Sequence, residues 1–478
     1  MLIRNAEILG GGIADLRIAG GKIAEIGSDL PVVPGEDSIE ARGNAVLPGL
    51  HDHHIHFLAF AASFSSVRCG PPEVATADQL VDALRTANMS LAPGEWIRGI
   101  GYHESVAGEI DRVWLDQAVP DRPVRVQHRG GRLWVLNSLG LKWLLSNPPS
   151  SFPRKRESIV EHRDSGEMDS RLRGNDELKR GRLYEGDAWL RQRLGNTLPA
   201  FGPASRYMAS RGVTGFTDAT PSNSAEELAI FRDAIDRGDL LQTVLMMGSD
   251  ALADTAMRGA TKIHLREVAL PPLDETATRI VRSHAARRPV AVHCVTLAEL
   301  MFTLAAFQDA GTITGDRIEH AGVTPADATP LIAEMGLTVV TQPNFIAERG
   351  DAYLRDVDPA DHDSLYRLRA FLDAGIPLGG GTDAPFGGAD PWAAMAAAVS
   401  RRSASGHLIG AGEALTPEQA LALFLADPSS PGGPARTVRT GMDADLCLID
   451  RQWDEARRDL GAVEVAMTMR SGRVIWRR

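Results

Sequence analysis

The sequence predicts an α/β protein: a parallel (β/α)8 TIM barrel with a small composite β-sandwich domain formed by both chain termini. Apolar runs alternate with amphipathic stretches through the middle of the chain, and both ends carry short period-two runs broken by Gly. Such alternation is typical of repeated βα units around a parallel sheet. The number of units favours a closed barrel over an open sheet, and no GxGxxG motif follows the first strand.

At the N-terminus, three runs alternate apolar and polar residues (2–9, 11–20 and 21–27), and DADLCLID, VAMTM and GRVIWRR repeat the pattern near the C-terminus. Period-two alternation is typical of half-buried strands. We therefore predict a composite β-domain of residues 1–46 plus 436–478 around a barrel of residues 47–435. Two unrelated edge hairpins are the alternative.

Within the barrel segment, short apolar runs that end in polar residues predict the strands, and longer amphipathic stretches between them predict the helices. Helical stretches include 77–91, 224–238, 274–288 and 297–311. The predicted strands are 44–50, 123–128, 212–219, 243–248, 261–265, 289–294, 317–322, 337–342 and 376–384.

Residues 149–178 do not follow this alternation. They are rich in charge, Pro, Gly and Ser, without an amphipathic period, which is typical of an exposed loop. The segment resembles translated palindromic DNA repeats found inside some bacterial genes. We interpret it as an inert insertion, since its acidic residues offset the basic ones that a binding arm would need.

Composition limits the function. The 478 residues are 44% hydrophobic and 24% charged, so a large core is available and wholesale disorder is excluded. The net charge of -11 argues against a nucleic-acid partner. Three separated cysteines support no disulfide framework. Without a signal-like segment or an apolar run of about 18 residues, we expect a cytoplasmic protein with no membrane partner. We expect a small-molecule substrate, and a homodimer is one open oligomeric state.

The strongest local signal is the sequence PGLHDHHIH at 48–56. Alternate side chains of a strand share a face, so His54 and His56 point the same way. Two imidazoles at the carboxyl end of a barrel strand can bind one metal ion. A solvent-exposed histidine cluster is the simpler alternative.

Residues of the ligand type recur at later strand ends, separated by about one or two βα units of roughly 30 residues. The carboxyl ends of all barrel strands meet at one mouth. We therefore expect these side chains to converge with His54 and His56 from strands 4, 5, 6 and 8. They are Lys262, His293, His320 and Asp383.

Together with GYHES (101–105), LDQAVPDRPVRVQH (115–128) and the closing LTPEQALALF and GMDADLCLID segments, these motifs resemble the amidohydrolase superfamily. Within it, the chain is similar to the amidohydrolase-3 branch, which includes N-substituted formamide deformylase-like proteins. The resemblance implies that His54, His56 and Asp383 bind a metal ion. It implies a second ion on His293 and His320, with a carboxylated Lys262 as the bridge.

The chemistry of these residue types agrees with the implied roles. Neutral imidazoles suit zinc, a divalent ion lowers the pKa of bound water to about 7, and Asp383 can move the proton to a leaving nitrogen. An unmodified Lys262 would be repelled by a dication, so it is either carboxylated or points away.

Four further residues are candidates for the substrate pocket. In GRLWVLNS (131–138), Arg132 stands where the family usually has a histidine. An arginine at this position, which we place just past barrel strand 2, would favour a substrate that carries a carboxylate. The other candidates are Tyr102, His128 and Gln342, each of which also fits a packing role.

The predicted activity is hydrolysis of a carbon–nitrogen bond, an amide or cyclic amide, by metal-activated water, with zinc as the expected metal. The alternative enzyme is a deaminase of a heterocyclic amine with one metal on His54, His56, His293 and Asp383. In that case Lys262 has no role. A catalytically idle barrel that binds a small molecule is the alternative from another class.

Overall fold

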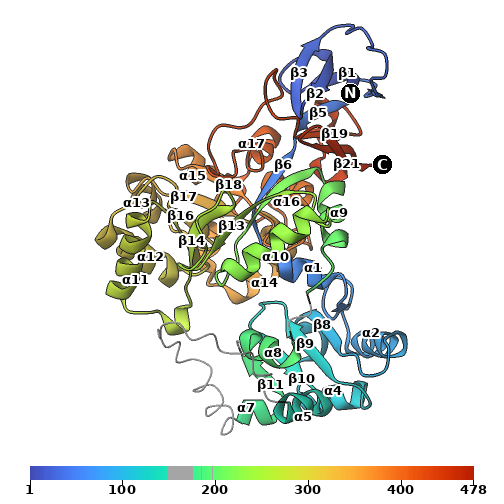
Figure 1. The fold of residues 1–478 in the computed structure, drawn as a ribbon. Coiled ribbons are helices and arrows are strands. Elements are labelled where there is room, and N and C mark those ends of the chain that lie inside the picture. The colour runs from blue at the N-terminus through green and yellow to red at the C-terminus, as the bar shows by residue number, and fades with distance from the viewer. Residues whose placement is uncertain (148–175, 185, 196–197) are drawn as a thin grey trace. The chain divides into compact units, whose positions relative to one another are not determined.

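The computed structural model describes residues 1–147, 176–184, 186–195 and 198–478. They form two compact units: residues 1–60 with 201–478, and residues 61–200 (Figure 1). Most of the insertion predicted at 149–178 lies outside the described residues. Its last three positions begin helix α7 (Asp176–Lys179), where Leu178 is buried.

The first unit contains a nearly closed barrel of eight parallel strands, which confirms the predicted barrel. Each barrel strand pairs with the barrel strand that follows it in the chain. The first two barrel strands also pair, although the second unit separates them in the sequence. The strands are β6 (Leu50–Ile55), β12 (Val213–Asp218), β13 (Thr243–Gly248), β14 (Arg258–His264), β15 (Val290–Cys294), β16 (Arg317–His320), β17 (Thr338–Thr341) and β18 (Leu378–Gly380).

Helices follow the barrel strands, and several begin with side-chain caps. Helix α12 begins with a capping box in which Thr296 and Glu299 exchange hydrogen bonds with each other's backbone N–H groups. The helices of this unit are α1 (Phe57–Ser63, which runs into the second unit), α9 (Phe201–Ser210), α10 (Ala225–Asp236), α11 (Leu273–Ala285), α12 (Leu297–Ala310), α13 (Ala328–Glu334), α14 (Asn344–Asp356), α15 (Arg369–Asp373), α16 (Pro391–Ser400), α17 (Pro417–Ala422) and α18 (Trp453–Ala456).

Backbone hydrogen bonds close the barrel between β6 and the segment after β18. The Asp383 N–H donates to the His54 carbonyl (2.8 Å), and the His56 N–H donates to the Ala384 carbonyl (2.9 Å). Gly381 lies in this seam, where a Cβ would stand 2.5 Å from the His54 Cβ. The backbones can approach this closely only because Gly381 has no side chain.

Strands from both ends of the chain pair in one eight-stranded sheet. Strand β19 near the C-terminus pairs with β5 near the N-terminus, so the two ends are not separate hairpins. A separate sandwich domain stays a prediction. The strands are β1 (Leu2–Ile8), β2 (Ile13–Ala19), β3 (Lys22–Gly27), β4 (Ser38–Glu40), β5 (Ala45–Pro48), β19 (Leu446–Ile449), β20 (Val465–Arg470) and β21 (Arg473–Arg477).

The apolar run predicted as one strand at 44–50 divides at Gly49. Strand β5 joins the terminal sheet, and β6 starts the barrel at Leu50. A Cβ on Gly49 would lie 2.3 Å from the Thr214 side chain, so a glycine is required where the chain passes between the sheets. The histidine motif consequently forms the strand β6 itself instead of following it.

The second unit has its own five-stranded sheet, in the order β11-β10-β9-β8-β7. Strand β9 contains the run at 123–128, so the prediction that this run is barrel strand 2 is wrong: β12 takes that place. The proposed domain boundaries stay predictions. The elements are β7 (Val67–Arg68), α2 (Ala77–Ser90), β8 (Ile97–Tyr102), α3 (Glu104–Ala107), α4 (Arg112–Ala118), β9 (Val124–His128), β10 (Leu133–Leu136), α5 (Ser138–Ser146), α7, β11 (Arg182–Tyr184) and α8 (Asp187–Leu194).

Over the described ranges, no helix combines the length and the apolar character needed to cross a membrane.

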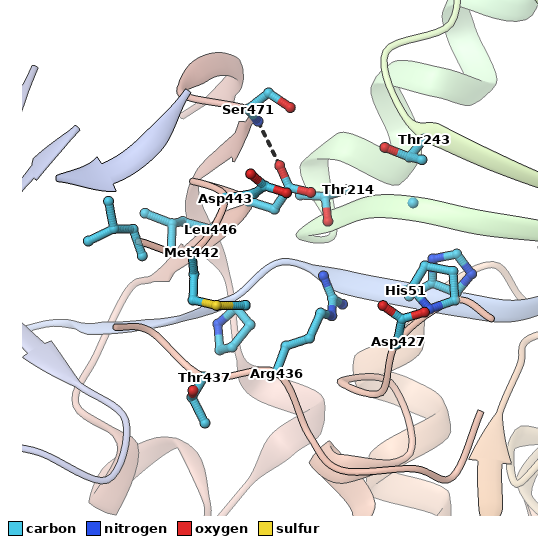
Figure 2. Close-up of a pocket in the computed structure, with 15 residues that line it drawn as sticks. His51, Thr214, Thr243, Asp427, Arg436, Thr437, Met442, Asp443, Leu446 and Ser471 are labelled. Carbon is cyan, nitrogen blue, oxygen red and sulfur yellow. Dashed lines mark hydrogen bonds between the residues drawn. The ribbon is translucent and has the colours of Figure 1, made fainter. Parts of the chain in front are cut away.

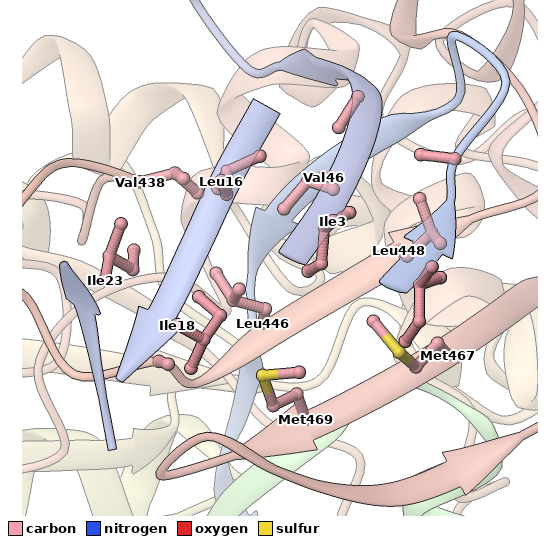
Figure 3. Close-up of a cluster of buried hydrophobic side chains, with 14 of the residues drawn as sticks. Ile3, Leu16, Ile18, Ile23, Val46, Val438, Leu446, Leu448, Met467 and Met469 are labelled. Atoms are coloured by element: carbon pink, nitrogen blue, oxygen red, sulfur yellow. The ribbon is translucent and has the colours of Figure 1, made fainter. Parts of the chain in front are cut away.

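The terminal sheet buries an apolar cluster that contains Ile3, Leu16, Leu446 and Met467 (Figure 3). We expect Ile3→Ala to lower the free energy of unfolding by about 2–5 kcal/mol, because Ile3 is fully buried and its removal leaves a cavity. Denaturant unfolding measures the change. Ile13→Ala in the same sheet is the control, since Ile13 is 51% exposed. Equal losses in the two variants would contradict the assignment of this core.

Candidate metal centre

Three ligand-type side chains converge at the seam that closes the barrel. The Nε2 atoms of His54 and His56 lie 3.6 and 3.4 Å from Asp383 Oδ1, and the three ligand atoms lie within 4.8 Å of one another. Donors about 2.1 Å from a tetrahedral zinc ion lie about 3.4 Å apart. The observed separations therefore fit one metal ion between these atoms.

Buried atoms of this cluster have no hydrogen-bond partner among the described residues. They are His54 Nε2, Asp383 Oδ1 and the Nζ of Lys262. A buried polar atom without a partner costs about 1–3 kcal/mol. The lone pairs of His54 Nε2 and Asp383 Oδ1 suit a divalent cation, whereas an uncarboxylated Lys262 would repel it.

The other ring nitrogens of His54 and His56 each have a partner. Nδ1 of His54 contacts a carboxylate oxygen of Glu319, and Nδ1 of His56 lies 3.1 Å from Thr220 Oγ1. Because a carboxylate only accepts, His54 carries its proton on Nδ1 and keeps a lone pair on Nε2. This is the tautomer that a metal ligand needs.

The remaining predicted ligands lie in the same barrel interior. The His320 ring centroid is 4.8 Å from that of His54 and 4.5 Å from that of His293. Lys262 is 2% exposed. Its Nζ lies 4.0 Å from Glu319 Oε2. The structure thus brings together all six residues that the spacing selected, and their roles as ligands stay predictions.

The backbone is left-handed at two of these positions, with φ of +71° at His320 and +56° at Asp383. Such conformations are unfavourable for residues other than Gly, and they concentrate at functional sites. At His320 the left-handed backbone accompanies an unusual placement of two neighbouring side chains. The side chains of both Glu319 and His320 contact His54, although neighbours in a regular strand point to opposite faces.

Burial and charge set the protonation of the cluster. Burial, reinforced by neighbouring cationic groups, lowers the pKa values of His56, His293 and His320 well below the usual range, so these imidazoles are neutral near pH 7. Burial also lowers the pKa of Lys262 to about 8, although Glu319 opposes this shift. Burial raises the pKa of Asp383 against the opposing effect of His54.

The sequence analysis did not select Glu319, which is fully buried at the centre of this site. Its pKa is well below the usual range, because Arg317, Lys262 and His54 together outweigh the effect of burial. One signal was available in the sequence. Two opposite charges, Arg317 and Glu319, stand two residues apart in a short predicted strand that ends in a candidate ligand.

The four predicted pocket residues divide between the two units. Gln342 belongs to the barrel unit, where its Oε1 lies 2.6 Å from His320 Nδ1 and orients that ring. The other three belong to the second unit. There the Tyr102 hydroxyl donates to the Gly108 carbonyl, and His128 Nε2 lies 3.1 Å from Glu104 Oε2. Arg132 is exposed in the turn before β10, so its placement past barrel strand 2 is wrong.

Two cavities lie in the first unit. One of about 300 Å³ lies at the amino ends of the barrel strands, between Thr214, Thr243 and Met442 (Figure 2), away from the metal centre. The other, of about 270 Å³, lies at the carboxyl ends. It is lined by Val295 and Gly322, each two residues beyond a candidate ligand, and by mostly apolar side chains. The second cavity therefore lies on the same side of the barrel as the cluster, although none of the candidate ligands lines it.

A parallel barrel with a His/His/Asp cluster at the carboxyl ends of its strands defines the class of metal-dependent hydrolases. The chain belongs to the amidohydrolase family: the model described as "Amidohydrolase family", Amidohydro_3, matches residues 37–476. It is therefore an amidohydrolase enzyme of the branch that the sequence motifs indicated.

Individual relatives agree with this membership. An N-substituted formamide deformylase of Arthrobacter pascens is 24% identical over 95% of this chain and 93% of its own length. An uncharacterised metal-dependent hydrolase from Pyrococcus furiosus has the same fold, with a TM-score of 0.67 and 20% identity over 94% of this chain and 98% of that one. An atrazine chlorohydrolase from Arthrobacter aurescens, solved with zinc, has a TM-score of 0.53 and 15% identity over 100% of this chain and 95% of that one.

We expect His54→Ala to lower the metal content of the purified protein, because it removes one of three converging ligand atoms. Elemental analysis of protein purified in zinc-supplemented medium measures the change. His407→Ala is the control, since that side chain is 68% exposed and outside the cluster. Unchanged metal in the His54 variant would show that the cluster is not the binding site.

Proposed function

We propose that this amidohydrolase cleaves an amide or cyclic amide bond with a metal-activated water molecule, zinc being the expected metal. The observation that carries the proposal is the convergence of His54 Nε2, His56 Nε2 and Asp383 Oδ1 at the carboxyl end of the barrel. The donor set fits a zinc ion, and the deformylase from Arthrobacter pascens acts on an N-substituted formamide, as its name states.

The chain's own residues supply the proton transfer. A divalent cation, when bound, lowers the pKa of water towards neutrality and polarises a carbonyl group. Asp383 accepts the proton of the attacking water and donates it to the leaving nitrogen. Asp383 is placed for this transfer, because its Oδ1 lies 3.6 Å from His54 Nε2 and 3.4 Å from His56 Nε2. The neighbouring 270 Å³ cavity offers room for an apolar group of the substrate.

Lys262 supports a second ion. Carbon dioxide adds to a neutral amine, and burial lowers the pKa of Lys262 to about 8, which raises the fraction of neutral amine near pH 7. Its Nζ is buried without a hydrogen-bond partner in the described residues. In this proposal, His54, His56 and Asp383 would hold one ion and His293 and His320 a second. A carboxylated Lys262 would supply a ligand between them.

Asp383→Asn tests the mechanism. We expect the variant to fold, as measured by circular dichroism, and to turn over amide substrates about 100-fold more slowly or worse, because the acid–base group is lost. Removal of metal by a chelator should abolish wild-type turnover, and zinc should restore it. Full activity of the variant on a substrate that the wild type hydrolyses would refute the proposed role.

The number of ions per chain separates the proposed amidase from a deaminase. Two ions, with a carboxylated Lys262 detected by mass spectrometry under native conditions, support the amidase, whereas one ion supports the deaminase. If no amide in a broad panel is turned over in a metal-dependent way, only a small-molecule-binding role would remain.

A further inference from the structure

One buried carboxylate joins groups from three barrel strands beneath the metal centre. Glu319 on β16 is fully buried. One of its oxygens, Oε2, contacts His54 Nδ1 on β6 and lies 4.0 Å from Lys262 Nζ on β14. Its other oxygen lies 2.6 Å from Arg317 Nε. Glu319 therefore contacts two predicted metal ligands without itself belonging to the converging set.

If the Arg317–Glu319 ion pair served only stability, Glu319 would not need to contact His54 as well. Arg317 neutralises Glu319 through Oε1 alone. The second oxygen, Oε2, contacts Nδ1 of His54, whose other ring nitrogen lies 3.6 Å from Asp383 Oδ1. A carboxylate there fixes the Nδ1–H tautomer, orients the ring and strengthens Nε2 as a donor. His56 lacks such an acceptor, because its Nδ1 partner is the neutral hydroxyl of Thr220.

The left-handed backbone at His320 makes this contact compatible with the site. With regular alternation, Glu319 would point away from the face that His320 occupies. The positive φ at His320 lets consecutive residues both reach His54, one through a hydrogen bond and the other through a ring contact. The left-handed backbone at His320 therefore allows Glu319 and His320 to contact the same histidine, His54.

We propose that Glu319 is a positioning residue for the metal centre: held by Arg317, it fixes the tautomer and orientation of His54 so that Nε2 points at the metal position. The inference rests on the proposed metal-dependent function. It concerns the affinity and electronic environment of the bound ion, which can be measured without any substrate.

The test compares metal binding by the wild type and Glu319→Gln. Zinc affinity is measured by competition with a chromophoric chelator, and the visible absorption of the cobalt(II)-substituted proteins reports the ligand field. We expect zinc affinity to fall about 10- to 100-fold, with full stoichiometry recovered at high zinc and with a shifted cobalt spectrum. Wild-type affinity together with an unchanged spectrum would overturn the proposal.

Two further variants separate positioning from folding. Glu413→Gln is the matched control: Glu413 is also a buried glutamate, 2.8 Å from Arg367 and outside the cluster, so its loss should leave zinc affinity unchanged. If Glu319→Gln does not fold, Arg317→Met/Glu319→Met removes both buried charges and should show the same loss of affinity. Should the double variant fold and bind zinc as the wild type does, Glu319 is structural only.

If the wild type itself binds no zinc, the proposed function is refuted, and the positioning role that rests on it is refuted as well. A wild type that binds zinc and a variant that binds it equally well refute the positioning role alone.

Discussion

The site depends on the closure of the barrel between its first and last strands. Two hydrogen bonds, from the Asp383 N–H to His54 and from the His56 N–H to Ala384, join residues that are more than 300 positions apart in the chain. The same residues supply the three ligand atoms that converge. Because their backbones are paired, the side chains cannot separate unless the barrel opens. The fold and the metal centre therefore share one seam, and Gly381 makes the close approach possible.

The interior around this seam is unusually polar for a barrel core. His54, Lys262 and Glu319 are all at most 2% exposed. Taking such groups out of water is unfavourable unless each finds a partner. Arg317 and Glu319 form an ion pair, while His54 Nε2 and Asp383 Oδ1 have no hydrogen-bond partner among the described residues. The lone pairs of these two atoms are available to a cation, whereas an uncarboxylated Lys262 would repel it.

The second compact unit shows that a local sequence pattern does not determine which sheet a strand joins. Tyr102, His128 and Arg132 belong to it, and Tyr102 and His128 form hydrogen bonds within that unit. The run at 123–128 has the same local pattern as a barrel strand. It pairs instead with β8 and β10, because the pairing partner of a strand depends on contacts that are distant in sequence.

The sequence by itself determined the barrel and the six residues that meet at its mouth. Strand periodicity and a spacing of about one βα unit are local signals, and parallel strands of a barrel present their carboxyl ends at one face. Only the tertiary structure decided which apolar run becomes the second barrel strand. It also decided which side chains contact and position the predicted metal ligands. Glu319 is the clearest case: regular alternation along β16 would turn its side chain away from the face of His320, yet with a left-handed backbone at His320 both side chains contact His54.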